Sequence, residues 1–340
     1  MDIEEIVSHS VKHNASDLHL CPRQPMRWRR QGKLEICPET APLPGELIDK
    51  WLTEAQKAQL EHEGQVDFSL TMNSGIRLRG QAFCQQQGYA LALRLLPTKC
   101  PSLASLGMPA AVLPLLQYSD GLILISGATG SGKSTSLAAM VNQLNQQREG
   151  HILLLEEPIE YLYQSGRSLI QQREAGRDCA GFASGLKAAL RQDPDVIVLG
   201  ELRDSDTLRL ALTAAETGHL VLATLHAGDA VQTIERIVNI FPPAEKEWIR
   251  CQLAGSLRGI LAQQLLATQA GGRVALYELL LNTSAVTHII REGKTWQLPG
   301  ILQTGQRRGM QSFEQSRRLL LDAGIITLSV KEDNIADIGE

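Results

Sequence analysis

The sequence lacks several features that would assign it to common classes of protein. Its 340 residues include six cysteines, and no two of these form a C-x-x-C pair. This scatter argues against a zinc knuckle or a disulfide framework, so we expect no zinc and reduced thiols. No apolar run approaches the length that spans a bilayer, so we also expect no membrane-spanning segment.

The sequence also lacks an excess of positive charge. Its formal net charge is -4, so no overall basic field attracts the protein to nucleic acid. A basic cluster surrounds Trp28, but a solvated hairpin face explains it more simply than a nucleic-acid contact. Residues 1–5 are acidic and do not have the basic-then-apolar layout of a signal peptide. We therefore expect a cytoplasmic protein that does not bind nucleic acid.

What the sequence does contain is a glycine-rich phosphate-binding motif. The motif comprises Gly127, Ala128, Thr129, Gly130, Ser131, Gly132, Lys133, Ser134 and Thr135. It follows the apolar residues 122–125 and opens a helical pattern, which is the context of a P-loop. Its glycines allow backbone N–H groups to form an anion-holding nest at a helix N-terminus. Lys133 is expected to reach the β- and γ-phosphates of ATP, and Ser134 to coordinate Mg²⁺.

Acidic residues follow two later apolar segments. Residues 152–155 precede Glu156, Glu157 and Glu160, and residues 195–199 precede Glu201. From about residue 120 onward, apolar runs alternate with helical segments, which predicts an α/β domain with a mostly parallel sheet. Open sheets of this kind place their chemistry at strand ends. The carboxylate cluster at 156–160 is therefore a candidate for the chemistry of the site, and Glu201 is a candidate to hold Mg²⁺ or to activate a water molecule.

A third apolar segment has a histidine at each end. These are His219 and His226, which bracket residues 220–225. A single histidine would more often be structural, whereas two that bracket a strand parallel to the P-loop strand also fit a nucleotide-sensing role. The sequence leaves both interpretations open.

Residues 1–98 predict a smaller α+β domain ahead of the nucleotide-binding region. Its patterns predict helices at residues 3–11 and 44–62, and strands at residues 17–20, 66–70, 76–83 and 89–96. Alternation places Arg77 and Arg79 on one strand face, and Arg94 lies on the last strand. Lone arginines are usually paired structurally, but three close together in a P-loop protein are candidates to sense a γ-phosphate.

Together these motifs resemble the secretion ATPase superfamily, and they are most similar to the PilT-type pilus retraction ATPases. The segments that carry the resemblance are residues 127–135, 156–160, 193–204, 208–219 and 224–226, together with residues 15–20 and 303–311. The resemblance implies a PAS-like domain at 1–98, a RecA-like P-loop ATPase domain with a helical C-terminal segment at 99–330, and a polar tail at 331–340.

The resemblance further implies a cytoplasmic homohexamer, peripheral at the inner membrane, that uses ATP and Mg²⁺ to act on a platform protein and retract a pilus. At the matching positions, Glu160 is the water-activating glutamate and Glu201 is the Walker B glutamate near Mg²⁺. His219 and His226 form the family's His box. The arginines resemble those that reach nucleotide at a subunit boundary, and they are Arg77, Arg79 and Arg94.

The chain departs from the family pattern at three places. Glu157 stands where the family usually has Asp, and Ala227 and Gly228 replace hydroxylated residues after His226. The C-terminal retraction motif, usually A-I-R-N-L-I-R-E, occupies residues 285–292, with Thr and His in place of the central Arg and Asn. This third change bears on force transmission and not on ATP hydrolysis.

Two other functions are compatible with a RecA-like core. One is a nucleic-acid translocase, which the acidic charge balance disfavours. The other is an adaptor that binds ATP but barely hydrolyses it, and the intact Lys133, Glu160 and Glu201 argue against it. Assembly ATPases of the superfamily typically carry a tetracysteine zinc site and a longer N-terminal extension. Because this sequence shows neither, a retraction-like subclass is expected.

Overall fold

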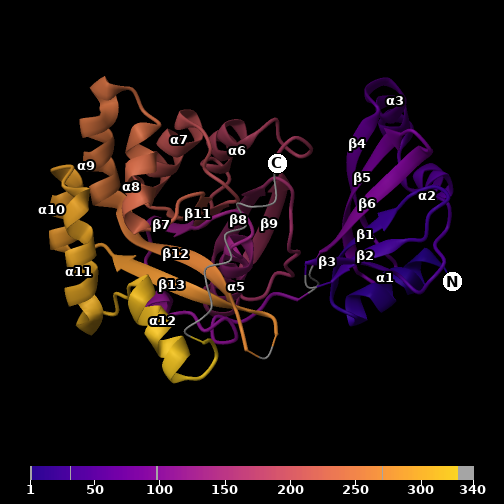
Figure 1. Cartoon of the computed structure of the whole chain (residues 1–340). Coiled ribbons are helices and arrows are strands. Elements are labelled where there is room, and N and C mark those ends of the chain that lie inside the picture. Colours follow the sequence, from indigo (N-terminus) through magenta and orange to yellow (C-terminus); the bar gives the residue numbers. More distant parts are fainter. Residues whose placement is uncertain (1, 31, 97–98, 270, 328–340) are drawn as a thin grey trace. The chain divides into compact units, whose positions relative to one another are not determined.

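The computed structural model of the chain describes residues 2–30, 32–96, 99–269 and 271–327 (Figure 1). The chain divides into two compact units, Met1–Lys99 and Cys100–Glu340. The expected polar tail at 331–340, and Pro97 and Thr98 of the expected linker, lie outside the described residues. No helix in the described part of the chain is both long enough and apolar enough to cross a membrane.

The first unit is an antiparallel sheet that shares one core with its helices. Within the described residues the sheet has six strands, in the order β3-β2-β1-β6-β5-β4. The element bounds are α1 (Ile3–Lys12), β1 (Ala15–Leu20), β2 (Arg27–Arg30), β3 (Lys33–Ile36), α2 (Pro44–Trp51), α3 (Glu54–Glu63), β4 (Gln65–Thr71), β5 (Arg77–Gln85) and β6 (Gly88–Leu96). Ile6, Leu47 and Leu60 from the helices pack with Leu78 and Leu91 of the sheet.

The expected single helix over residues 44–62 is wrong, because the structure has two helices there. α2 ends at Trp51, and Thr53 caps a new helix, α3. The Gln56 N–H donates to the Thr53 hydroxyl at 3.3 Å, and the Thr53 N–H donates to the Gln56 side chain at 3.0 Å. This reciprocal capping satisfies backbone donors at a helix start, so it favours a new helix over a continuous one.

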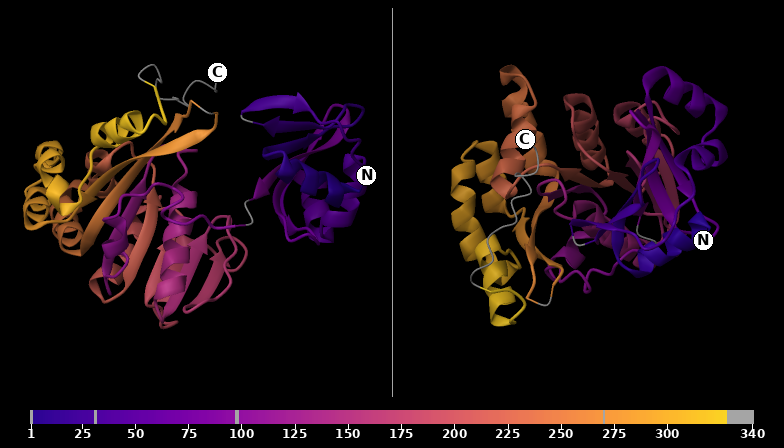
Figure 2. Two further views of the ribbon diagram at one scale, coloured as in Figure 1. Left: turned by 90° about the horizontal axis from the view of Figure 1, so that it is seen from below. Right: turned by 45° about the vertical axis from the view of Figure 1, so that its right-hand side comes forward.

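The second unit is a sheet with helices on both faces (Figure 2). Within the described residues this sheet has seven strands, in the order β13-β12-β7-β11-β10-β8-β9, and every pairing except β12–β13 is parallel. Its strands are β7 (Gly121–Ser126), β8 (His151–Glu156), β9 (Leu169–Glu174), β10 (Val196–Leu199), β11 (Leu220–Leu225), β12 (Leu257–Ala267) and β13 (Arg273–Leu281). Its α-helices are α4 (Val112–Leu115), α5 (Lys133–Gln147), α6 (Phe182–Ala189), α7 (Ser205–Glu216), α8 (Ala230–Asn239), α9 (Lys246–Ser256), α10 (Ser284–Arg291), α11 (Leu298–Thr304) and α12 (Phe313–Asp322). Short 3₁₀ turns lie at Pro243–Glu245, Thr295–Gln297 and Gly305–Arg308.

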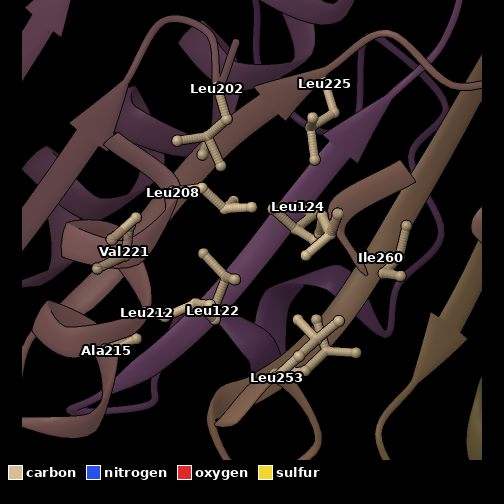
Figure 3. Close-up of a cluster of buried hydrophobic side chains, with 14 of the residues drawn as sticks. Leu122, Leu124, Leu202, Leu208, Leu212, Ala215, Val221, Leu225, Leu253 and Ile260 are labelled. Atoms are coloured by element: carbon tan, nitrogen blue, oxygen red, sulfur yellow. The ribbon is translucent and has the colours of Figure 1, made fainter. Parts of the chain in front are cut away.

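The core of the second unit lies on both sides of β7. Leu122 and Leu124 point to the face covered by α7 and α9, where they pack with Leu212 and Leu253 (Figure 3). The alternate residues Ile123 and Ile125 pack with α5 on the other face. Strands buried on both faces are apolar at every position, which explains the uninterrupted apolar runs in the sequence. Because neighbouring strands are parallel, the carboxyl ends of β7, β11, β10 and β8 lie at one edge of the sheet.

Candidate nucleotide site

The P-loop connects the end of β7 to the start of α5. Gly127, Gly130 and Gly132 have φ angles of 153°, 76° and 87°, which L side chains rarely adopt. In the described structure no side chain caps α5 at Gly132, so the first N–H groups of the helix are not taken by a cap. The loop and the helix start therefore have the geometry of an anion-binding nest that fits phosphate groups.

The Lys133 ammonium lies against the inner side of this loop. The residue is 8% exposed, and its Nζ donates to the carbonyl oxygens of Gly127 at 2.9 Å and Ala128 at 2.8 Å. Burial lowers the pKa of Lys133, and the nearby carboxylates of Glu201 and Glu160 partly oppose that shift. Lys133 therefore places a poorly hydrated positive charge at the base of the nest, where a bound phosphate would meet it in a medium of low polarity.

Glu201 lies just past the end of β10 and is held by two neighbours. Its carboxylate accepts hydrogen bonds from Arg203, with Oε2 2.8 Å from Nη2, and from His226, with Oε1 3.0 Å from Nε2. Arg203 in turn donates to Glu157 at 3.0 Å. Burial acts to raise the pKa of Glu201, but the Arg203 hydrogen bond and the surrounding positive charges outweigh it and lower the pKa. Glu201 is therefore an ionised carboxylate near neutral pH.

His226, at the end of β11, links this cluster to the P-loop. Its Nδ1 lies 3.4 Å from Lys133 Nζ and 3.5 Å from Thr129 Oγ1. Burial and the Lys133 charge lower the pKa of His226, although Glu201 opposes them. A neutral imidazole that carries its proton on Nε2 satisfies both sides, because Nε2–H donates to Glu201 and Nδ1 accepts from Lys133.

Glu160 lies in the segment that follows β8. In the described residues no hydrogen bond or ion pair engages its carboxylate, which acts on Lys133 through charge. The next residue, Tyr161, is buried and donates its hydroxyl to Thr135 at 3.3 Å, which connects this segment to the first turn of α5. Ser134, in the same turn, is exposed. The structure thus brings Glu160, Glu201, His226 and the P-loop into one site.

Comparison with known proteins shows the family to which the chain belongs. The family model described as type II/IV secretion system protein matches residues 1–331. The chain belongs to this family. It is similar to the type IV pilus retractation ATPase PilT of Pseudomonas aeruginosa, with 41% identity over 330 residues that cover 96% of each chain. It is also 60% identical over 316 residues to the uncharacterized protein YggR of Escherichia coli K12, with 93% and 97% of the two chains covered.

Solved structures of relatives confirm the fold class. The crystal structure of the pilus retraction motor PilT with bound ADP matches with a TM-score of 0.89 and 42% identity, covering 96% of this chain and 95% of that one. The ATPase DotB of Legionella pneumophila matches with a TM-score of 0.84 and 28% identity, covering 96% and 93%. The predicted membership of the PilT-type secretion ATPases is therefore confirmed. So is the prediction of a RecA-like α/β domain preceded by a smaller α+β domain.

The two histidines that the resemblance assigns to a His box lie far apart in this unit. His219 precedes β11, and its carbonyl oxygen accepts from the N–H of Gly121, the first residue of β7, at 3.1 Å. β11 has six residues, which span about 20 Å. His219 therefore lies at the sheet edge opposite the P-loop, where its Nδ1 is 3.1 Å from the carbonyl oxygen of Ala214. Within this unit only His226 joins the nucleotide site.

The three candidate arginines lie on the first unit's sheet. They share the face opposite the helix-packed residues Leu78 and Leu91. Arg79 pairs with Arg94 across β5 and β6. Arg94 is 65% exposed and donates from Nε to Asp17 at 3.0 Å, so it has an acidic partner within its own unit.

Burial and pairing distinguish the other two arginines. Arg77 is buried, at 8% exposure, and is engaged by its surroundings. Arg79 is exposed, and among the residues that the structure describes it forms no ion pair.

Gln263 of β12 contacts the P-loop and was not anticipated from the sequence. Its Nε2 donates to the Ser131 carbonyl oxygen at 2.6 Å, and its Oε1 accepts from the Ser136 hydroxyl at 2.6 Å. The residue is 2% exposed. The sequence does carry a signal for this contact, because Gln263 is an amide inside an otherwise apolar strand pattern. Buried polar groups of this kind normally have specific partners.

Proposed function

We propose that this chain is an Mg²⁺-dependent ATPase that hydrolyses ATP to ADP and phosphate and acts as a homohexamer in pilus retraction or a related secretion process. The observation that carries the proposal is the buried Lys133 ammonium in a glycine nest, within electrostatic reach of Glu160 and Glu201. Family membership and the similarity to PilT with bound ADP support nucleotide as the ligand.

The residues around the nest fit the groups that the reaction needs. Carboxylate and hydroxyl oxygens are the ligands that Mg²⁺ prefers, and Glu201 and Ser134 supply them. Mg²⁺, when bound, would neutralise charge on the phosphate oxygens. Lys133 holds the phosphates by charge, and the first N–H groups of α5 orient them.

Glu160 is the proposed general base, with Glu201 as the alternative. Glu160 has no cation bound to its carboxylate in the described residues, whereas Glu201 is paired with Arg203 and His226. A carboxylate with a lowered pKa is a weaker base. Glu160 would therefore orient and deprotonate water, while Glu201 would hold the metal.

The arginines of the first unit would complete the site of a neighbouring subunit. Arg79 is exposed without an ion pair among the described residues, and Arg94 is largely exposed beside it. Cationic side chains supplied across an interface stabilise charge that develops on the transferred phosphoryl group. We accordingly propose a PAS-like domain at 1–98 that supplies arginines and a RecA-like domain at 99–330 that binds nucleotide.

An inner-membrane platform protein is the proposed mechanical partner of the ring. The ring would lie in the cytoplasm and be peripheral at the membrane through that partner. The similarity to a pilus retraction motor supports this placement.

The test is ATPase activity measured against protein concentration, with light scattering in the same buffer. We expect activity per subunit to rise as rings form, because each site needs a neighbour's arginines. Constant specific activity of a monomer would contradict the assembled site. Absence of ATP hydrolysis at every ring concentration would contradict the enzyme. Stimulation by single-stranded nucleic acid that falls with salt would instead support a translocase.

A further inference from the structure

The Gln263 side chain is fixed in one orientation between two parts of the P-loop motif. Its Nε2 faces a carbonyl oxygen, that of Ser131, at 2.6 Å. A carbonyl oxygen only accepts, so the amide must present N–H on that side. Its Oε1 then faces the Ser136 hydroxyl, which can donate, at 2.6 Å. Both polar atoms of this buried amide are therefore used on the loop and on the first turns of α5.

The backbone of Gln263 also lies directly against the loop. β12 pairs with β7 up to Ala262 and Ser126, so Gln263 comes beside Gly127. A Cβ atom on Gly127 would lie 2.4 Å from the Gln263 carbonyl oxygen, and one on Gly132 would lie 2.8 Å from its Nε2. The Gln263 backbone thus requires a glycine at position 127 in addition to the φ angle there, and Gly132 lies closely against the Gln263 amide.

The geometry points to Gln263 as a positioning residue for phosphate binding, an inference that rests on the proposed nucleotide site. In a trans peptide the C=O and N–H groups point in opposite directions. By holding the Ser131 carbonyl away from the hollow of the loop, the amide turns the Gly132 N–H toward it. Without this contact the peptide between Ser131 and Gly132 can rotate, and one donor of the nest is lost.

The pairing of β12 with its neighbours holds the Gln263 amide in position against the loop. β12 is hydrogen-bonded to β7 on one side and to β13 on the other, where Gln263 pairs with Tyr277. The Tyr277 N–H donates to the Ser316 hydroxyl of α12 at 3.1 Å. The loop is therefore oriented by a strand that is itself anchored on both sides.

The experiment compares three variants by titration with a fluorescent ADP derivative. Gln263→Leu removes both amide contacts while filling the space. Gln264→Leu is the matched control, because Gln264 lies on the opposite face of the same strand. We expect Gln263→Leu to raise the dissociation constant for ADP at least about tenfold, since a buried carbonyl loses its donor. Gln264→Leu should leave that constant unchanged.

Gln263→Glu separates positioning from folding through its pH profile. Burial raises the pKa of a carboxyl group, and the protonated form can donate to the Ser131 carbonyl. ADP affinity relative to wild type should thus be near normal at about pH 6 and should fall as the pH rises and the carboxylate forms. A role limited to stability would change the thermal midpoint without this change in relative affinity.

Three results would overturn the inference. They are a folded Gln263→Leu protein with wild-type ADP affinity, an equal loss in Gln264→Leu, and a Gln263→Glu profile parallel to that of wild type. The proposed function is tested separately by wild-type hydrolysis of ATP. A wild-type protein that binds ADP without hydrolysing ATP would contradict the ATPase but not the role of Gln263. Failure of the wild type to bind ADP would contradict both.

Discussion

Replacing Glu160 with glutamine should stop hydrolysis without preventing ATP binding. The substitution keeps the shape of the side chain and removes its negative charge and its basicity. The carboxylate acts on Lys133 through charge alone, so its loss removes a repulsion from the phosphates and should not weaken binding. General-base catalysis typically contributes about 10²-fold to 10⁴-fold, and we expect turnover to fall by that factor.

The assay couples phosphate release to a colour change and measures retained nucleotide in the same samples. Glu160→Gln should retain ATP, whereas wild type should retain ADP. Glu157→Gln is the control, because it makes the same change three residues earlier. Glu157 is exposed and paired with Arg203 at 3.0 Å, and exposed pairs contribute about 0–1 kcal/mol. Its loss should change turnover less than about fivefold.

Glu201→Gln provides the comparison that can refute this assignment. Glu201 is the proposed carboxylate ligand of Mg²⁺, so the variant should lose metal-dependent binding together with activity. A normal rate in Glu160→Gln, together with a rate loss at unchanged ATP affinity in Glu201→Gln, would transfer the base to Glu201.

Three further predictions concern charge and assembly. Lys133→Ala should abolish hydrolysis and weaken ATP binding while the circular dichroism spectrum stays that of the folded protein, and near-normal turnover would remove the central assignment. Mixed rings of Lys133→Ala and Arg94→Ala subunits should recover activity that neither protein shows alone. If sizing shows that the rings contain both variants and they are still inactive, the arginine acts within its own subunit. The lowered pKa of His226 means that the unfolded chain binds more protons just below its ordinary value of 6.5. The free energy of unfolding should therefore fall as the pH drops through that window, and His226→Asn should flatten the slope measured by urea titration. An identical slope in the variant would contradict the shift.

The sequence predicted the fold class because its strongest patterns are local. A P-loop needs only a strand, a glycine turn and a helix in order, and each has a short-range sign in the chain. β8, β10 and β11 could also be predicted from the sequence, because strands that are buried on both faces form continuous apolar runs. The break between α2 and α3 is harder to predict, because its capping residues Thr53 and Gln56 lie within a stretch rich in helix-forming residues.

The site was only partly predictable, because some of its contacts join distant parts of the chain. Gln263 reaches Ser131 across 132 positions, and no spacing rule links them. The Arg203 bridge between Glu201 and Glu157 likewise depends on how two strand ends meet. The bracketing histidines were recognised, but a strand places its two ends about 20 Å apart, so His219 could not accompany His226.

The burial of β11 sets a mechanical limit on any motor built from this unit. All six of its residues are buried, and it is hydrogen-bonded to β7 and β10 along its length. Slipping it by one residue would move every side chain to the opposite face of the sheet, where it would meet different packing partners, and would break both ladders. A force applied at the nucleotide edge is therefore expected to move β11 together with its neighbouring strands and packed helices, and not to slide it past them.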